Sequence, residues 1–145
     1  KHSEARLPHR LVFNMSAATS GHLLAIAAGG AAGALLRYGL TNLMALLLGR
    51  NFPWGTLLVN VLGSFFVGLL YVWMLERAPA SDMLRLGLVT GLLGALTTFS
   101  TFSLDTLAMF HDGRYGAAGA NIALNVCVCM LACGCAMWLA RSFTN

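Results

Sequence analysis

The sequence predicts an all-α membrane protein with four transmembrane helices. Of its 145 residues, 58% are hydrophobic and only 10% are charged, so polar groups are too few to cover a soluble globule. A helix needs about 20 apolar residues to cross a bilayer, which allows four crossings and no separate soluble domain. We expect the crossings over residues 22–48, 54–75, 83–110 and 115–139. They form one domain over 22–141, with an N-terminal tail over 1–21 and a C-terminal tail over 142–145.

The charged residues argue against a nucleic-acid partner and leave the membrane orientation open. The net charge is +4, but the basic residues are scattered singly. Lys and Arg near the ends of the crossings set orientation, and here they are almost balanced between the two sides. Both orientations can therefore insert, which makes an antiparallel dual-topology homodimer possible. The residues compared are Arg77, Arg85 and Arg141 on one side, and Arg50 and Arg114 on the other.

The first crossing carries a helix-packing pattern and one charge. Gly29 and Gly33 are four residues apart, which offers a surface for close helix packing. Arg37 interrupts the crossing about midway, where a charge is costly unless it faces protein or water. Two interpretations stay open: Arg37 faces protein or water inside the bundle, or it extends to the lipid headgroups as an interfacial anchor.

Small and polar residues repeat every four positions in the second and fourth crossings, so each set lies on one helix face. Such a stripe can stabilise the packing of helices in the membrane, or it can form one wall of an ion path. Asn60 is the most informative member, because an amide in the membrane must find partners. The cysteines behave as small hydrophobes and lack zinc-site spacing. The stripes are Thr56, Asn60, Ser64 and Gly68, and Asn121, Asn125, Cys129 and Cys133.

The third crossing contains the most unusual stretch of the chain. Five hydroxyl side chains fall within residues 97–103, and glycines and β-branched residues that weaken a helix surround them. We predict a helix broken near Gly94 to Thr97, with Phe99 and Phe102 one turn apart just beyond the break. The alternative is a continuous helix whose hydroxyls bond back to preceding carbonyls. Asp105 follows, either as a buried functional acid or as a hydrated interfacial one.

Three segments resemble the signature of the Fluc/CrcB family of fluoride channels. The third crossing matches Gly-Gly-x-Thr-Thr-Phe-Ser-Thr-Phe-Ser, with Ala95 in place of the second glycine. Residues 29–38 and 55–65 also match, and order and spacing agree from about Leu23 to Arg141. The chain departs from the family at Asp105, where a glutamate is usual, and in the fourth-crossing stripe, which usually begins with Tyr and continues with Ser.

The resemblance implies a fluoride-selective passive channel that exports fluoride across a bacterial inner membrane. It implies two pores per antiparallel homodimer and a central structural sodium ion bound by the backbone carbonyls of Gly94 and Thr97. It also implies fluoride and the lipid bilayer as partners, and it favours a structural or vestibule role for Arg37. No enzymatic activity is expected, because the sequence has no apparent nucleophile and base pair or metal-ligand set.

Residue types suggest how an anion would be handled. Aromatic ring edges carry partial positive charge, so Phe99 and Phe102 can meet fluoride edge-on. Conduction needs sites that bind and also release, which weak serial donors provide. The expected pathway has Asn60 as an amide donor, Ser100 and Thr101 as hydroxyl donors, and Thr56, Asn121 and Asn125 continuing the polar track.

Two other functions fit the composition less well. A small proton-coupled multidrug exporter also has about four crossings in an antiparallel dimer, but it needs a central acid, and the first crossing has Arg37 and no acid. A non-transporting helix-bundle scaffold explains the glycine pairs but leaves the cluster from Thr97 to Ser103 unexplained.

Overall fold

The computed structural model describes residues 9–77 and 81–143 of the chain, and nearly all of them are helical. Residues 1–8 and 144–145 of the predicted tails, and 78–80 of the loop between the second and third crossings, lie outside the described residues. Short π-helical segments (η) continue several of the α-helices. The elements are α1 (His9–Leu48), α2 (Trp54–Tyr71), η1 (Val72–Arg77), α3 (Asp82–Arg85), η2 (Leu86–Leu93), α4 (Gly94–Leu96), α5 (Phe99–His111), α6 (Tyr115–Ala123), η3 (Leu124–Val128) and α7 (Cys129–Ser142).

Within the described residues, four helical segments are long and apolar enough to cross a membrane. They are Thr19–Leu48, Trp54–Met74, Asp82–His111 and Tyr115–Ser142. Their ends lie within a few residues of the predicted crossings. The protein is therefore an all-helical integral membrane protein.

Helix α1 extends into the region predicted as the N-terminal tail. Helix α1 begins at His9, so residues 9–21 belong to the same helix as the crossing. Extending an existing helix costs far less than starting one, and no proline or glycine interrupts residues 10–20.

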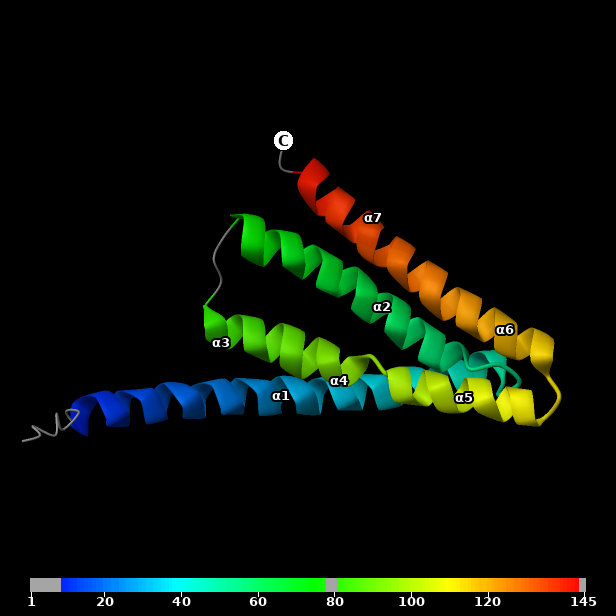
Figure 1. The fold of residues 1–145 in the computed structure, drawn as a ribbon, viewed down its shortest axis with the longest axis horizontal. Coiled ribbons are helices and arrows are strands. Elements are labelled where there is room, and N and C mark those ends of the chain that lie inside the picture. Colours follow the sequence, from blue (N-terminus) through cyan, green and yellow to red (C-terminus); the bar gives the residue numbers. More distant parts are fainter. Residues whose placement is uncertain (1–8, 78–80, 144–145) are drawn as a thin grey trace, which may run out of the picture.

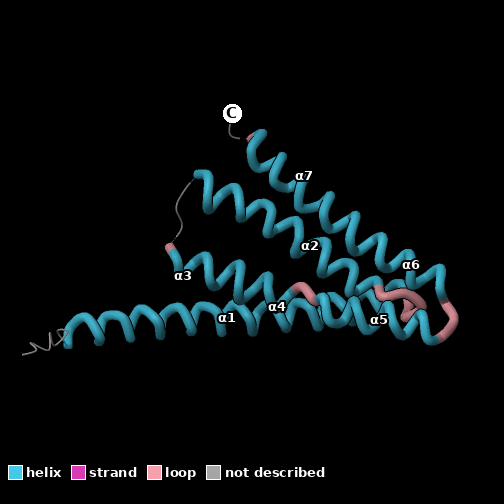
Figure 2. Tube along the Cα trace, in the orientation of Figure 1, coloured by secondary structure: helices cyan, strands magenta, loops and turns pink. Residues whose placement is uncertain are grey.

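The helices converge at the end that carries the turn between α5 and α6, and they spread apart toward the opposite end (Figure 1). Helix α1 packs along η2 and α4, while α2 packs along α7. A short non-helical segment separates α4 from α5 within the third crossing (Figure 2). The third crossing thus lies between the first and the second over its α3–α4 half.

Glycines bring α1 and η2 into close contact. A Cβ atom added to Gly29 would overlap the carbonyl of Gly87, and one added to Gly33 would overlap the carbonyl of Leu92. A Cβ on Gly91 would lie 2.7 Å from the carbonyl oxygen of Ile26. We call this contact the glycine seam. It confirms the packing surface predicted from the spacing of Gly29 and Gly33.

Two glycines end helices at the converging end of the bundle. Gly49 follows α1 with a φ of 77°, and Gly113 follows α5 with a φ of 72°. After α5, the Gly113 N–H donates to the Phe110 carbonyl at 3.1 Å and the Arg114 N–H donates to the Met109 carbonyl at 2.8 Å. This is a Schellman motif, in which the left-handed residue favours glycine. It turns the chain sharply into α6.

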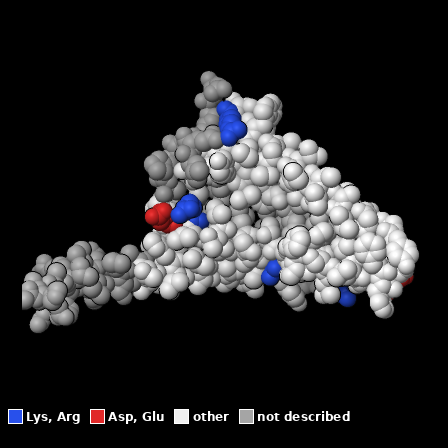
Figure 3. Space-filling model, viewed as in Figure 1, with Lys and Arg blue, Asp and Glu red and all other residues white. Residues whose placement is uncertain are grey.

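The apolar core is small, and many large apolar side chains are exposed. Val59, Leu93 and Leu96 form the buried cluster between the crossings. The visible surface is largely uncharged, with Lys, Arg, Asp and Glu confined to small isolated patches (Figure 3). Lipid replaces water around such a surface, so specific contacts between helices must hold the bundle together.

Candidate functional site

The third crossing is interrupted at two threonines. Thr97 has φ −78° and ψ 157°, and Thr98 has φ −152° and ψ 109°, so both are extended between the end of α4 and the start of α5. The sequence placed the interruption near Gly94 to Thr97, whereas Gly94 has helical dihedral angles. β-Branched threonine favours extended backbone more than a helix, which accounts for the shift toward Thr97 and Thr98.

Thr98 caps the helix that carries the two phenylalanines. Its Oγ1 accepts a hydrogen bond from the Thr101 backbone N–H at 3.1 Å and donates to Thr101 Oγ1 at 2.9 Å. A threonine in this position satisfies an N–H group that the start of a helix leaves without a partner. The hydroxyl cluster therefore restarts the helix immediately before Phe99.

Asn60 of α2 holds the extended backbone at two points. The Thr98 N–H donates to Asn60 Oδ1 at 2.8 Å, and Asn60 Nδ2 donates to the Thr98 carbonyl at 3.3 Å. In a continuous helix the Thr98 N–H would donate to the carbonyl of Gly94 instead. The side-chain amide of Asn60 therefore finds its partners in the backbone N–H and carbonyl of Thr98.

A row of hydrogen-bonded side chains continues from Asn60 to the fourth crossing and back to α5. Asn60 Nδ2 donates to Asn125 Oδ1 at 2.9 Å, Asn125 Nδ2 donates to Asn121 Oδ1 at 2.9 Å, and Asn121 Nδ2 donates to Thr106 Oγ1 at 2.8 Å. Thr106 Oγ1 then donates to the Phe102 carbonyl at 2.7 Å. We call these four residues the asparagine ladder.

The two phenylalanines lie close together on the first turn of α5. Their ring centroids are 5.3 Å apart with an interplanar angle of 56°. Phe99 is 79% exposed on the single chain, whereas Phe102 is half-buried. The Ser103 hydroxyl donates to the Phe99 carbonyl at 2.9 Å, which parallels the bond from Thr106 to Phe102. Hydroxyls that donate to a carbonyl four residues earlier, which a continuous helix would also allow, therefore occur just after the interruption.

A cavity of about 410 Å³, here called the central cavity, opens beside the interruption. Its wall comes from α2, the third crossing and the fourth crossing. Most of the residues predicted to handle an ion meet there, and Cys129 of the fourth-crossing stripe joins them. The predicted residues in the lining are Asn60, Gly94, Thr97, Phe99, Phe102 and Asn125.

A second cavity of about 440 Å³, here called the turn-side cavity, lies at the converging end of the bundle. Thr56, Thr101 and Asp105 line it together with Arg50 and Arg114. Thr56 Oγ1 donates to Asp105 Oδ2 at 2.9 Å. The carboxylate of Asp105 therefore has a hydrogen-bond partner on α2.

The remaining predicted residues lie outside these two linings. Arg37 Nη1 donates to the Thr97 carbonyl at 3.5 Å, which supplies the partner that the sequence could not name. Ser100 is exposed and lies within 3.2 Å of Thr98 Oγ1. Asn121 is fully buried in the asparagine ladder.

Sequence reasoning missed two residues of this site, Thr98 as the cap and Thr106 as the last member of the ladder. The position of Thr106, four residues after Phe102, was the available signal, because a hydroxyl at that spacing can reach the earlier carbonyl.

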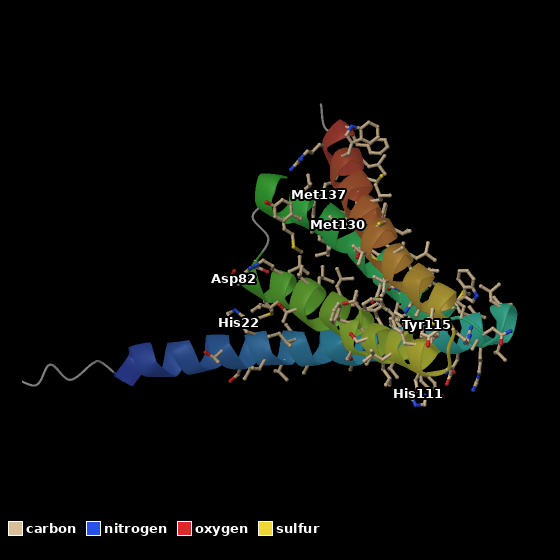
Figure 4. The ribbon with its side chains drawn as sticks, turned by 45° about the vertical axis from the view of Figure 1, so that its right-hand side comes forward. His22, Asp82, His111, Tyr115, Met130 and Met137 are labelled. Atoms are coloured by element: carbon tan, nitrogen blue, oxygen red, sulfur yellow. The ribbon has the colours of Figure 1, made fainter. Side chains whose placement is uncertain are left out.

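Figure 4 labels His22 and Asp82 toward one end of the bundle and His111 and Tyr115 toward the other. The interruption falls between these ends, in the middle of the third crossing.

Comparison with known proteins identifies relatives over most of the chain. A family model described as CrcB-like protein, Camphor Resistance (CrcB), matches residues 24–137. Relatives named fluoride-specific ion channel FluC include the following three. That of Aeromonas salmonicida is 49% identical over 107 residues, which cover 74% of this chain and 86% of the relative. That of Dehalococcoides mccartyi is 50% identical, with coverage of 77% and 85%, and that of Syntrophotalea carbinolica is 46% identical, with coverage of 83% and 98%.

Proposed function

The chain belongs to the CrcB family, and from this premise we propose that it is a fluoride-selective passive ion channel that exports fluoride across a bacterial inner membrane. The protein is a channel and not an enzyme. The observation that carries the proposal is the pair of phenylalanines, set on a hydroxyl-rich interruption and facing a cavity within the membrane-spanning bundle.

The central cavity suits a small anion that must pass without being trapped. Ring edges of Phe99 and Phe102 carry partial positive charge, and Thr97 and Thr98 place polar groups beside them. The described residues that line this cavity include no Lys, Arg, Asp or Glu. Fluoride would meet weak donors in series instead of a full charge, and conduction needs sites that release as well as bind.

The pathway would connect the two cavities through the first turn of α5. Thr56 and Thr101 offer hydroxyls in the turn-side cavity, and Phe99 and Phe102 offer ring edges in the central cavity. Ser100, exposed on the same turn, would add a hydroxyl. We assign Asn60 and Asn125 to the wall, because hydrogen bonds within the protein engage their amide groups.

A second copy of the chain would complete the pathway. Phe99, Ser100 and Thr101 are exposed on the single chain, at the depth where the third crossing is interrupted. Irregular backbone and hydroxyls at that depth persist only where protein or a polar cavity covers them. An antiparallel homodimer with two pores meets this need, and the balanced arginines permit both orientations. Accessible tags on both termini should label from both sides of the membrane. One-sided labelling would contradict the antiparallel arrangement.

The carbonyls of Gly94 and Thr97 fit the structural sodium ion implied by the family resemblance. In a continuous helix, these two carbonyls would accept hydrogen bonds from the N–H groups of Thr98 and Thr101. Here both N–H groups donate to side chains instead. Two released carbonyls from each of two chains would give four hard oxygen ligands for a hard cation. The ion would bridge the copies, with Arg37 as a competing donor at Thr97. Dimer dissociation should be faster in potassium than in sodium, and equal rates would argue against this site.

Ion efflux from liposomes tests the function directly. The purified protein is reconstituted in vesicles loaded with either fluoride or chloride, and efflux is recorded with ion-selective electrodes after the membrane potential is clamped. We expect rapid fluoride efflux and much slower chloride efflux, without a proton gradient. Comparable chloride efflux, or fluoride efflux that requires a proton gradient, would refute a selective passive channel.

A further inference from the structure

The asparagine ladder ends at the phenylalanine turn from both directions. Asn60 binds the backbone of Thr98, the residue before Phe99, and Thr106 donates to the carbonyl of Phe102. Asn121 and Asn125, both from the fourth crossing, join these two ends. The turn that carries both rings is therefore attached at its start and at its end to the same hydrogen-bonded row.

The members of the ladder are not ion contacts, although Asn60 and Asn125 line the central cavity. Asn121 is 0% exposed, Thr106 is 6% exposed and Asn125 is 7% exposed. Both hydrogen bonds from Asn125 Nδ2 go to Asn121, at 2.9 and 3.1 Å, and a side-chain amide has only two N–H donors. Asn60 likewise donates to Thr98 and to Asn125. These two amides have no N–H left for fluoride in this arrangement.

The ladder also has a single direction. Each side chain donates to the next, from Asn60 through Asn125 and Asn121 to Thr106, whose hydroxyl donates to the Phe102 carbonyl. Hydrogen bonds in such a series polarise one another and strengthen the whole row at low dielectric. Thr106 is the terminal member, and it alone converts the amide row into a contact with the backbone of Phe102.

We propose that Thr106 is a positioning residue for ion selectivity, which holds Phe102 through the asparagine ladder without touching the ion. The inference rests on the proposed fluoride channel function. Edge-on ring contacts discriminate between halides of different size only if the rings are held in place. When the hydroxyl of Thr106 is lost, the turn is free to widen and the preference for fluoride over chloride decreases.

The test compares hydroxyl variants at two positions of the same helix. Thr106→Val keeps the side-chain shape but removes the hydroxyl, whereas Thr106→Ser keeps the hydroxyl. Ser103→Ala is the matched control, because Ser103 makes the same kind of bond to the Phe99 carbonyl outside the ladder. Fluoride and chloride efflux are measured for each variant in liposomes and expressed as a ratio.

Thr106→Val removes the hydrogen bond to the Phe102 carbonyl and also the acceptor of Asn121 Nδ2. We expect the fluoride-to-chloride ratio to decrease by roughly fivefold, the factor that corresponds to the one net hydrogen bond that holds Phe102. Thr106→Ser and Ser103→Ala should keep the wild-type ratio. If Thr106→Val does not yield folded protein, Thr106→Cys replaces it, because a thiol is a weaker donor and should give a smaller decrease.

An unchanged ratio in folded Thr106→Val, or in Thr106→Cys if it stands in, would overturn the inference. An equal decrease in Ser103→Ala would also overturn it, because the effect would then follow any hydroxyl near the rings. A wild-type protein that does not distinguish fluoride from chloride would instead refute the channel function itself. The two failures are therefore distinguishable in the same set of vesicles.

Discussion

The glycine seam and the asparagine ladder hold the third crossing to its neighbours in opposite ways. At the seam, α1 and η2 approach until a Cβ at Gly29 or Gly33 would overlap a carbonyl of the facing helix. At the ladder, three amides and a hydroxyl join α2, α5 and the fourth crossing by hydrogen bonds of 2.7 to 2.9 Å. The first contact depends on small volume and the second on specific polar groups.

The difference between the two contacts shows which part of the third crossing needs accurately placed side chains. In lipid, small residues permit close packing and polar side chains provide directed attachments between helices. The seam lies along the helical part of the third crossing before the interruption, where only a stable contact is required. The ladder lies at the interruption and the rings, where backbone groups need partners and side chains need fixed positions.

The largest expected effect comes from removing the ladder's attachment to the interruption. Asn60→Leu keeps similar volume but leaves the Thr98 N–H without its acceptor and Asn125 Oδ1 without its donor. Each buried unsatisfied group costs about 1–3 kcal/mol, so we expect a severe loss of folded protein. Thermal unfolding in detergent measures this loss. Asn42→Leu, at an exposed asparagine of α1, is the control, and equal stability of the two variants would contradict the assignment.

A smaller loss of stability is expected from a substitution at the glycine seam, and this substitution should leave the selectivity for fluoride over chloride unchanged. Gly29→Ala places a Cβ against the Gly87 carbonyl, whereas a Cβ at Gly30 has nothing within 4 Å. Overpacking costs about 1–3 kcal/mol, and the better helix propensity of alanine offsets up to about 1 kcal/mol of it. Unfolding of Gly29→Ala should occur at a lower temperature than that of Gly30→Ala. If their unfolding temperatures are equal, the seam is not tightly packed.

The smallest effect is expected at the hydrogen bond between Thr56 and Asp105. Thr56→Val removes the donor at 2.9 Å from Asp105, and interhelical hydrogen bonds in membranes are worth about 1 kcal/mol. Thr56→Ser keeps the donor and should resemble wild type. We expect a modest decrease in unfolding temperature and in fluoride efflux for Thr56→Val alone. Equal behaviour of the valine and serine variants would show that the hydroxyl contributes nothing.

The sequence predicted the four crossings well because hydrophobic length is a local property. Residues 54–75 and 83–110 were expected to be membrane-spanning from their composition, and the structure has helical segments at Trp54–Met74 and Asp82–His111. Gly29 and Gly33 indicated close packing from their spacing alone. Residues 9–21 continue the helix of α1, which their mixed polarity does not indicate.

The partners within the site could not be predicted because they join residues far apart in the chain. Asn60 and Asn125 are recognisable as costly amides, but their mutual bond depends on how α2 and the fourth crossing pack. The partner of Arg37 is a backbone carbonyl, which no side-chain pattern indicates. The spacing of Thr106 from Phe102 indicates a bond to the Phe102 carbonyl, but its bond to Asn121 depends on how α5 and α6 pack.

The central claim is that fluoride is recognised by the edges of two phenylalanine rings. Phe99→Ile and Phe102→Ile keep apolar bulk and remove the aromatic quadrupole, and similar-volume swaps usually cost less than about 1.5 kcal/mol in stability. Fluoride efflux and dimer stability are measured on the same preparations of both variants. We predict that efflux falls by at least about tenfold, equivalent to about 1.4 kcal/mol in the barrier, while the dimer persists. Wild-type efflux in both variants would contradict the claim and leave only the hydroxyls as ion contacts.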